Sequence, residues 1–319
     1  MMLKACLPSS DDPSHPGSLP IALSSLRTLE LQDFTAELRQ FFTATRIPNK
    51  ARVDIELSDG NPESECVGSL LSALRTSWIL PKDMGLDAGG NFIQTDILDL
   101  RIVDTRMRNV PQIMCWLSSH DLPPNFDVEN PPANLVISLA SGSAMGINLL
   151  LPVIAAHLDI SSLRSLKIAS KYIDLTTELF ALFKDLTKLD KIAIWKSYDR
   201  LSEFLETLRM KEEHAPSFPA LRSINMHGID FDEDRTGDSI TAVLPLYFAL
   251  KSHEESHPTI KQFKMTQCTN FLEDHWEALC EALSEEVEKY WDEVEDIVEP
   301  SDEDEEDDDG SELGHWGVY

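Results

Sequence analysis

Residues 163–168 of the chain read LRSLKI, with apolar residues at the first, fourth and sixth positions. A single match to this spacing is common in any amphipathic protein, but this chain contains six in sequence, which indicates a repeat architecture. The other five are residues 26–31 (LRTLEL), 97–102 (ILDLRI), 189–194 (LDKIAI), 221–226 (LRSINM) and 260–265 (IKQFKM).

Each copy predicts a short strand that follows a turn. Alternation sends Leu166 and Ile168 inward and Lys167 outward, while the leading Leu163 packs from the turn. Residues 52–57 (RVDIEL) and 134–139 (NLVISL) keep the apolar pair without a clear leading leucine, so we count them as degenerate copies. A stretch of helical spacing follows each strand, at residues 36–43, 63–78, 110–119, 144–157, 174–184, 199–211, 239–252 and 272–291.

The repeat unit is therefore strand, turn and helix, and neither element can bury its apolar face alone. We expect an α/β fold, an irregular leucine-rich-repeat solenoid of about eight units, with parallel strands on the concave side and helices on the convex side. The same alternation also fits a doubly wound α/β sheet. The expected organisation is a disordered N-terminal segment at 1–20, the solenoid at 21–291 and a disordered acidic tail at 292–319.

The formal net charge of −29 over 319 residues is concentrated at one end of the chain. Residues 285–312 hold 17 acidic residues against Lys289 alone, so they carry −16 of it. Such a field repels nucleic-acid phosphates and anionic lipid headgroups. We therefore expect protein partners and no nucleic acid or membrane.

Targeting signals and cysteine motifs point to an intracellular chain. Its start has too short an apolar run for a signal peptide, and its longest apolar stretch, 147–158, is about half a membrane span. The five cysteines are scattered without a C-x-x-C pair. We expect reduced thiols, a cytoplasmic or nuclear location and a monomer.

One motif suggests zinc chemistry. Residues 253–257 read HEESH, which matches the H-E-x-x-H signature that places two imidazoles on one helix face. Pro258 follows directly and disfavours helical geometry at His257. We interpret the motif as a polar helix end with two exposed histidines, and we expect no metal.

Two further motifs are incomplete. The spacing of Asp230, Asp232 and Asp234 resembles a calcium loop, but Arg235 and Thr241 replace the required glycine and glutamate. Residues 141–146 (SGSAMG) lack the second glycine of a nucleophile elbow. We therefore expect no enzymatic activity and no cofactor.

Outward strand positions from the middle repeats onward carry mainly lysine, so the concave face is expected to be locally basic. Trp195, an aromatic residue beside a lysine, is the expected anchor for a protein partner. The candidate partner-binding residues are Arg101, Lys167, Lys191, Trp195, Asn225, His227 and Lys264.

Four segments carry a family resemblance: LSSLRTLELQDF (23–34), ISSLRSLKIASKYI (160–173), LTKLDKIAIW (186–195) and FPALRSINMHGIDF (218–231). They resemble the repeat region of the large fungal F-box protein group. The resemblance implies a receptor that selects substrates for a ubiquitin ligase. The F-box has no counterpart in residues 1–20, so adaptor binding is assigned to no residue.

The sequence thus favours a non-enzymatic protein-binding scaffold whose partner lies on the concave sheet. An alternative comes from the eight consecutive acidic residues at 302–309. Acidic-tailed nuclear leucine-rich-repeat proteins bind histones, and the resemblance implies that these residues bind histones or other basic proteins.

Overall fold

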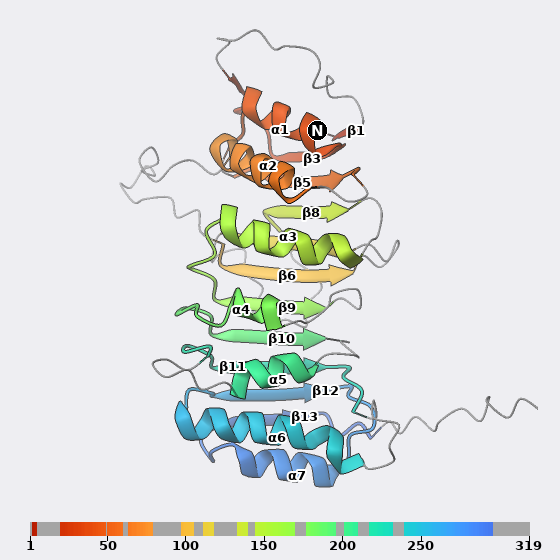
Figure 1. Ribbon diagram of the computed structural model, residues 1–319, viewed down its shortest axis with the longest axis vertical. Coiled ribbons are helices and arrows are strands. Elements are labelled where there is room, and N and C mark those ends of the chain that lie inside the picture. The colour runs from red at the N-terminus through yellow and green to blue at the C-terminus, as the bar shows by residue number, and fades with distance from the viewer. Residues whose placement is uncertain are drawn as a thin grey trace, which may run out of the picture.

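The computed structural model describes residues 2–4, 20–48, 50–59, 63–78, 97–104, 111–117, 133–139, 144–169, 177–195, 201–209, 217–231 and 239–295. Over these residues the chain is a mixed α/β protein with an open sheet of 11 strands, a second sheet of two strands and seven helices. Figure 1 shows the strands stacked one above another along the long axis.

The large sheet has the order β1-β3-β5-β8-β7-β6-β9-β10-β11-β12-β13, and all neighbours are parallel except those of β7. The small sheet pairs β2 with β4. The strands are β1 (Met2–Lys4), β2 (Ile21–Ala22), β3 (Thr28–Asp33), β4 (Thr45–Arg46), β5 (Arg52–Leu57), β6 (Asp99–Asp104), β7 (Pro111–Trp116), β8 (Leu135–Leu139), β9 (Ser165–Ala169), β10 (Lys191–Trp195), β11 (Ser223–His227), β12 (Gln262–Thr266) and β13 (Glu288–Trp291).

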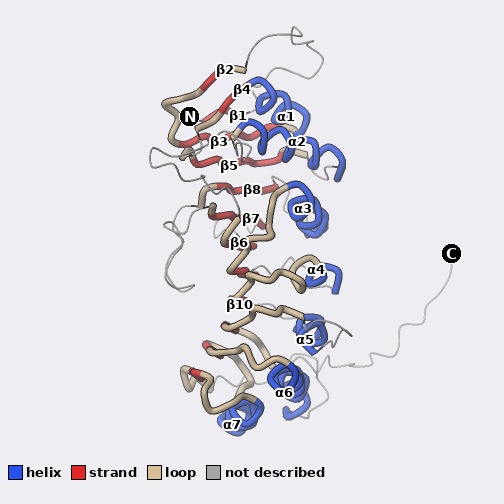
Figure 2. The backbone as a smooth tube through the Cα atoms, turned by 90° about the vertical axis from the view of Figure 1, so that its left-hand side faces the viewer, coloured by secondary structure: helices blue, strands red, loops and turns tan. Residues whose placement is uncertain are grey.

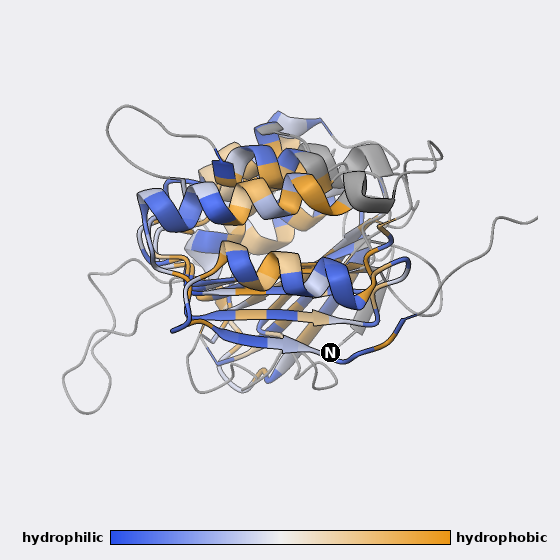
Figure 3. Cartoon of the chain, turned by 90° about the horizontal axis from the view of Figure 1, so that it is seen from below, coloured by the Kyte–Doolittle hydropathy of each residue, from blue (hydrophilic) through white to orange (hydrophobic). Residues whose placement is uncertain are grey.

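The described helices all lie on one face of the large sheet, as Figure 2 shows. They are α1 (Thr35–Ala44), α2 (Ser64–Ser77), α3 (Ala144–His157), α4 (Thr177–Ala181), α5 (Leu201–Arg209), α6 (Ser239–Ser256) and α7 (Glu273–Ala282). Figure 3 looks along the stack and shows the same two layers, with apolar residues in both. This one-sided arrangement excludes the doubly wound alternative for the described helices, because that fold needs helices on both faces. None of them is long and apolar enough to cross a membrane.

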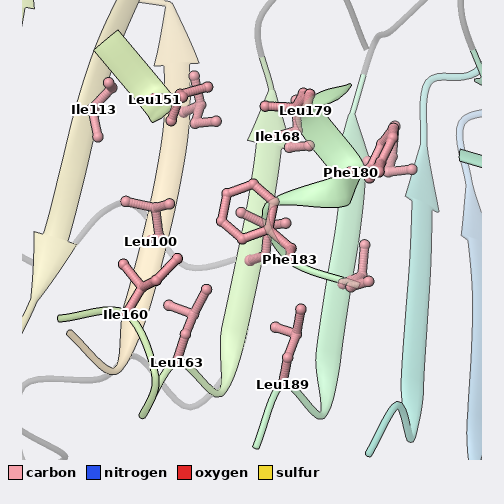
Figure 4. Close-up of a cluster of buried hydrophobic side chains, with 14 of the residues drawn as sticks. Leu100, Ile113, Leu151, Ile160, Leu163, Ile168, Leu179, Phe180, Phe183 and Leu189 are labelled. Carbon is pink, nitrogen blue, oxygen red and sulfur yellow. The ribbon is translucent and has the colours of Figure 1, made fainter. Parts of the chain in front are cut away.

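The repeated pattern predicts the buried side of the sheet correctly. In β9, Leu166 and Ile168 are fully buried beneath the helices, and the leading Leu163 lies in the same core. Leu163 enters from a turn in which its amide donates to the carbonyl of Ile160 at 2.9 Å. Figure 4 shows Leu163 and Ile168 together with Phe180 of α4 and Phe183, which follows that helix.

Successive units from β9 to β12 also share a backbone arrangement at the strand entrance. The amides of Asp190 and Lys191 both donate to the carbonyl of Arg164, at 2.9 and 3.0 Å. The amides of Arg222 and Ser223 repeat this pairing on the carbonyl of Asp190, at 2.8 and 2.9 Å. The first residue after each leading leucine therefore lies beside its equivalent in the next unit.

The largest departure from the expected repeat is in the middle of the sheet. Residues 110–119 were predicted as a helix, but Pro111–Trp116 form β7, which is antiparallel to both β6 and β8. The side chains of β7 are apolar on both faces. Ile113 and Cys115 join the main core, while Met114 and Trp116 form a second small cluster with Ala133. The strands therefore do not stack in sequence order here.

Two further expectations need adjustment at the ends of the chain, and a third is not tested. The helix predicted at 272–291 ends at Ala282, and Glu288–Trp291 form the edge strand β13. Met2–Lys4, within the segment expected to be disordered, form β1 beside β3. Residues 296–319, most of the expected acidic tail, lie outside the described residues. Both degenerate copies are strands, as predicted.

The cysteines provide a direct test of which faces are buried. Cys66, Cys115, Cys268 and Cys280 are free thiols, and Cys6 lies outside the described residues. Cys66 is exposed on α2, whereas Cys115 on β7 and Cys268 after β12 are fully buried. Burial raises the pKa of the Cys268 thiol to about 11 and also raises the pKa of Cys115.

We predict that iodoacetamide labels Cys66 in the folded protein and leaves Cys115 and Cys268 unmodified, because only thiolates that solvent reaches react. Mass spectrometry of the labelled peptides measures this. Labelling in urea, where all three thiols become accessible, is the control. Equal labelling of Cys115 and Cys66 in the folded protein would contradict the position of β7.

Candidate functional site

The outer face of the sheet, opposite the helices, carries all seven candidate residues. The register places Arg101 beside Lys167, followed by Ala193, Asn225 and Lys264 on successive strands. Neighbouring strands are about 4.8 Å apart, so these residues form one row. Trp195 and His227 are paired in the next row, and Lys191 lies at the amino end of β10. The structure thus brings the predicted residues together.

Their accessibility differs from what was expected. We expected all seven side chains to be open to a partner, but Arg101, Lys167 and Asn225 are only 1%, 4% and 6% exposed. Trp195, His227 and Lys264 are half-buried, and Lys191 is exposed. The expectation is therefore wrong for Arg101, Lys167 and Asn225. Contacts within the outer face explain the burial of the two cations.

Arg101 is held in a desolvated ion pair. Its Nε lies 3.1 Å from Oδ1 of Asp99, and its guanidinium carbon lies 4.6 Å from the centre of the Trp116 ring. Burial raises the pKa of Asp99, although Arg101 and Lys167 act in the opposite direction. Removing one member of such a pair destabilises a protein, because the other charge is left buried and unpaired. Arg101 therefore has a structural role here.

Lys167 begins a line of stacked groups that crosses three strands. Its Nζ lies 3.0 Å from the centre of the Trp195 ring, and the rings of Trp195 and His227 are 4.4 Å apart. His227 Nδ1 is 2.9 Å from Oγ1 of Thr266. A cation over an indole contributes roughly 0.5–2 kcal/mol, depending on desolvation. These contacts fix the position of the Trp195 ring.

Among the described residues of this face, three buried polar atoms lack a hydrogen-bond partner. They are Nε1 of Trp116, Nε1 of Trp195 and Oδ1 of Asn225. An unsatisfied buried donor or acceptor costs about 1–3 kcal/mol. Solvent does not reach these atoms, so they are internal features of the face and not contact points for a bound group.

Apart from Lys191, sequence reasoning missed a group of cations at the amino ends of β9–β12. We call it the basic edge, and its exposed members are Arg164, Lys188, Lys191, Arg222 and Lys261. Arg164, Lys191 and Arg222 surround Asp190, since all three lower its pKa against the larger, opposite effect of burial. A signal was present in the sequence: Arg164, Arg222 and Lys261 each directly follow a leading apolar residue of the repeat.

The opposite end of the outer face is acidic. Glu30 on β3 lies beside Asp54 on β5, and Glu56 accepts a 3.0 Å hydrogen bond from Nε2 of Gln32. Burial, followed by repulsion from Glu30 and Glu56, raises the pKa of Asp54 to about 6. The outer face therefore changes from acidic at β3–β5 to basic at β9–β12.

The H-E-x-x-H segment lies elsewhere, at the end of α6. The rings of His253 and His257 are 6.3 Å apart and perpendicular, and His257 Nε2 lies 2.9 Å from the carbonyl oxygen of Pro219. His253 is buried, so the expectation of two exposed histidines is wrong for it. Burial and His257 lower the pKa of His253 to about 4. The described residues contain no group of three His, Cys, Asp or Glu side chains arranged for a metal ion.

The other two motifs lie largely outside the described residues. Residues 141–143, and Asp232 and Asp234, are among those not described. Asp230, the first residue of the calcium-like spacing, accepts a 2.7 Å hydrogen bond from Nδ2 of Asn270. Its carboxylate therefore links the loops that follow β11 and β12.

A scan against protein-family models and searches of curated proteins and of solved structures returned no match.

The acidic end of the outer face makes stability depend on pH. The pKa of Asp54 is about 6 in the folded chain and near 3.8 when unfolded, so the folded state binds the proton more tightly. The contribution of Asp54 to stability is therefore greatest below pH 3.8 and is lost as the pH rises through 6. We predict that Asp54→Asn raises the free energy of unfolding at pH 8 by about 1–2 kcal/mol, allowing for partial solvent screening, with no gain at pH 3.5.

Urea unfolding at both pH values measures this effect. Glu178→Gln, at an exposed position of α4, is the control because it removes the same charge without relieving burial. A gain for Asp54→Asn that equals the control, or that does not depend on pH, would refute the prediction.

Proposed function

We propose that this chain is a non-enzymatic protein-binding scaffold, built as an irregular leucine-rich-repeat solenoid, whose partner binds the outer face across β9–β12. The solenoid assignment is supported by strand entrances that repeat the same paired hydrogen bonds. It is also supported by matched left-handed residues after three successive strands: Gly228, Gln267 and Glu293, with φ of 63°, 50° and 58°. Recurrence at one position of each unit is typical of repeat proteins.

One observation carries the choice of a protein partner. The ring of Trp195 is half-buried on the outer face, and the side chain of Lys191, four residues earlier on the same strand, is exposed. A polypeptide can place an apolar side chain on this ring and an acidic group beside the lysine. Trp195 also has the features of an interface anchor, because its ring is fixed by Lys167 and His227.

The likeness to the repeat region of fungal F-box proteins extends this proposal. In that family the repeats select a substrate for a ubiquitin ligase. We accordingly propose that the partner of this chain is a protein held for processing by other components, and that the outer face selects it by shape and charge.

The test compares two double variants as baits in affinity purification from the native cell. We predict that Trp195→Ala/Lys191→Ala lowers recovery of a specific partner at least tenfold, since loss of a central aromatic anchor typically costs 2 kcal/mol or more. The matched control is Phe248→Ala/Lys251→Ala, which removes an exposed aromatic residue and a lysine from α6 on the helical face.

Circular dichroism and thermal melting establish that both variants are folded. Selective loss with the outer-face variant supports the proposal. Unchanged recovery with this variant, or equal loss with the control, rejects the outer face as the binding site.

A further inference from the structure

The basic edge is unusual in a chain of net charge −29. The charged groups of Arg164, Lys191 and Arg222 form no ion pair or hydrogen bond with other described residues. Asp190 is the carboxylate that they surround, and burial raises its pKa. The remaining two cations have weak partners, because Lys188 donates to Ser162 and Lys261 meets the exposed Glu286 at 3.4 Å. Over the described residues that enter β9–β12, the five cations and Lys184 oppose Asp159, Asp185 and Asp190, so the edge has a positive excess of three.

This excess is arranged in a line. The register of β9 to β12 puts Arg164, Asp190, Arg222 and Lys261 immediately before neighbouring strands, with Arg222 and Lys261 about 4.8 Å apart and Arg164 about 9.6 Å from Arg222. Asp190 lies between the two arginines, and Lys191 follows it on the outer face, so a cation is also present at that strand. An extended acidic peptide, whose same-side carboxylates repeat about every 6.6 Å, can place carboxylates along these cations.

The chain itself contains such a peptide. Residues 302–309 are eight consecutive acidic residues, and they begin seven positions after Glu295, the last described residue. Glu295 accepts a 3.2 Å hydrogen bond from the amide of Glu273 at the start of α7, which places the departing chain beside β12 and β13. Seven extended residues span up to about 24 Å.

The chain beyond Glu295 is long enough to reach the basic edge. Three strand spacings, or about 14 Å, separate β13 from β10 across the sheet, and the length of a five-residue strand adds about 17 Å along the strand direction. The direct path from the end of β13 is therefore about 22 Å. The path from Glu295 is longer by residues 292–295, and the 14 residues 296–309, which extend up to about 46 Å, span it. Because the segment is tethered, its effective concentration at the edge is on the order of millimolar, above that of most free competitors.

We propose that residues 302–309 bind the basic edge of the same chain and occupy the amino end of the partner-binding face. Release of this segment then accompanies partner binding. The competition with a partner rests on the proposed function, whereas the contact between the segment and the edge does not.

Zero-length carbodiimide cross-linking of the full chain tests the contact, because this reagent joins a lysine to a carboxylate only where the two groups touch. We expect cross-links from residues 302–309 to Lys188, Lys191 and Lys261 at low salt, identified by mass spectrometry. A mixture of isotope-labelled and unlabelled chain distinguishes links within one chain from links between two. The Lys261–Glu286 pair, 3.4 Å apart, is the internal positive control.

A matched pair of variants tests the role of the cations. Arg164→Glu/Arg222→Glu keeps every reactive lysine and should reduce the cross-links at least tenfold. Arg39→Glu/Arg209→Glu makes the same charge change at exposed positions of α1 and α5. This control should leave the yield of the cross-links within twofold of that of the unaltered chain. An equal loss of cross-links in both variants would show that the acidic segment is attracted by positive charge in general and not by the basic edge. That result would overturn the proposal.

A second arm uses a synthetic peptide of residues 300–311. We expect it to bind at least tenfold more tightly to a full-length chain in which the eight acidic residues are replaced by Asn and Gln than to the unaltered chain. Equal binding to both chains, without cross-links within a chain, would assign the edge to an external acidic protein. Cross-links from 302–309 to added histones, with none to the edge, would assign the segment to basic proteins. Either result overturns the proposal, and neither depends on whether Trp195 captures a partner.

Discussion

Burial of one face of every central strand beneath the helices is the constraint on which this structure depends. A strand such as Lys191–Trp195 presents Ile192 and Ile194 to the core, and neither is shielded by its own unit alone. Full burial of such a side chain stabilises the fold by roughly 1.5–3 kcal/mol, and this gain exists only when adjacent units stack. All the described helices therefore cover one face and leave the other for polar contacts.

The outer face consequently holds groups that are costly to desolvate. Arg101 and Lys167 are buried there in contact with Asp99 and two indole rings. They hold the face rigid, and under the proposed function a partner contacts the groups around them. Trp195 is fixed and half-buried, and Lys191 is exposed at the strand entrance. Fixed aromatic groups beside exposed cations lose little entropy when a partner binds.

The repeat predicted the parallel strands because Leu166 and Ile168 alternate with polar neighbours. The same reasoning failed at β7, where Met114 and Trp116 are apolar on the outer face and Ile113 and Cys115 are apolar on the inner face. A strand that is buried on both faces lacks the alternation of apolar and polar residues, so its sequence pattern cannot be distinguished from that of a buried helix. That error also hid the burial of Arg101, since the ring covering its guanidinium belongs to Trp116. The basic edge was overlooked because only alternate strand residues were considered, although Arg164 and Arg222 follow the leading leucines.

A cysteine scan along Gln262–Thr266 tests the central claim most directly, namely that each strand has one face beneath the helices and one face outward. Single cysteines replace each of the five residues of β12, and mass spectrometry measures the alkylation rate of each in the folded protein. The account predicts that positions 262, 264 and 266 react at least tenfold faster than positions 263 and 265, where Phe263 and Met265 are fully buried. Uniform rates, or rates repeating every three to four residues, would contradict it.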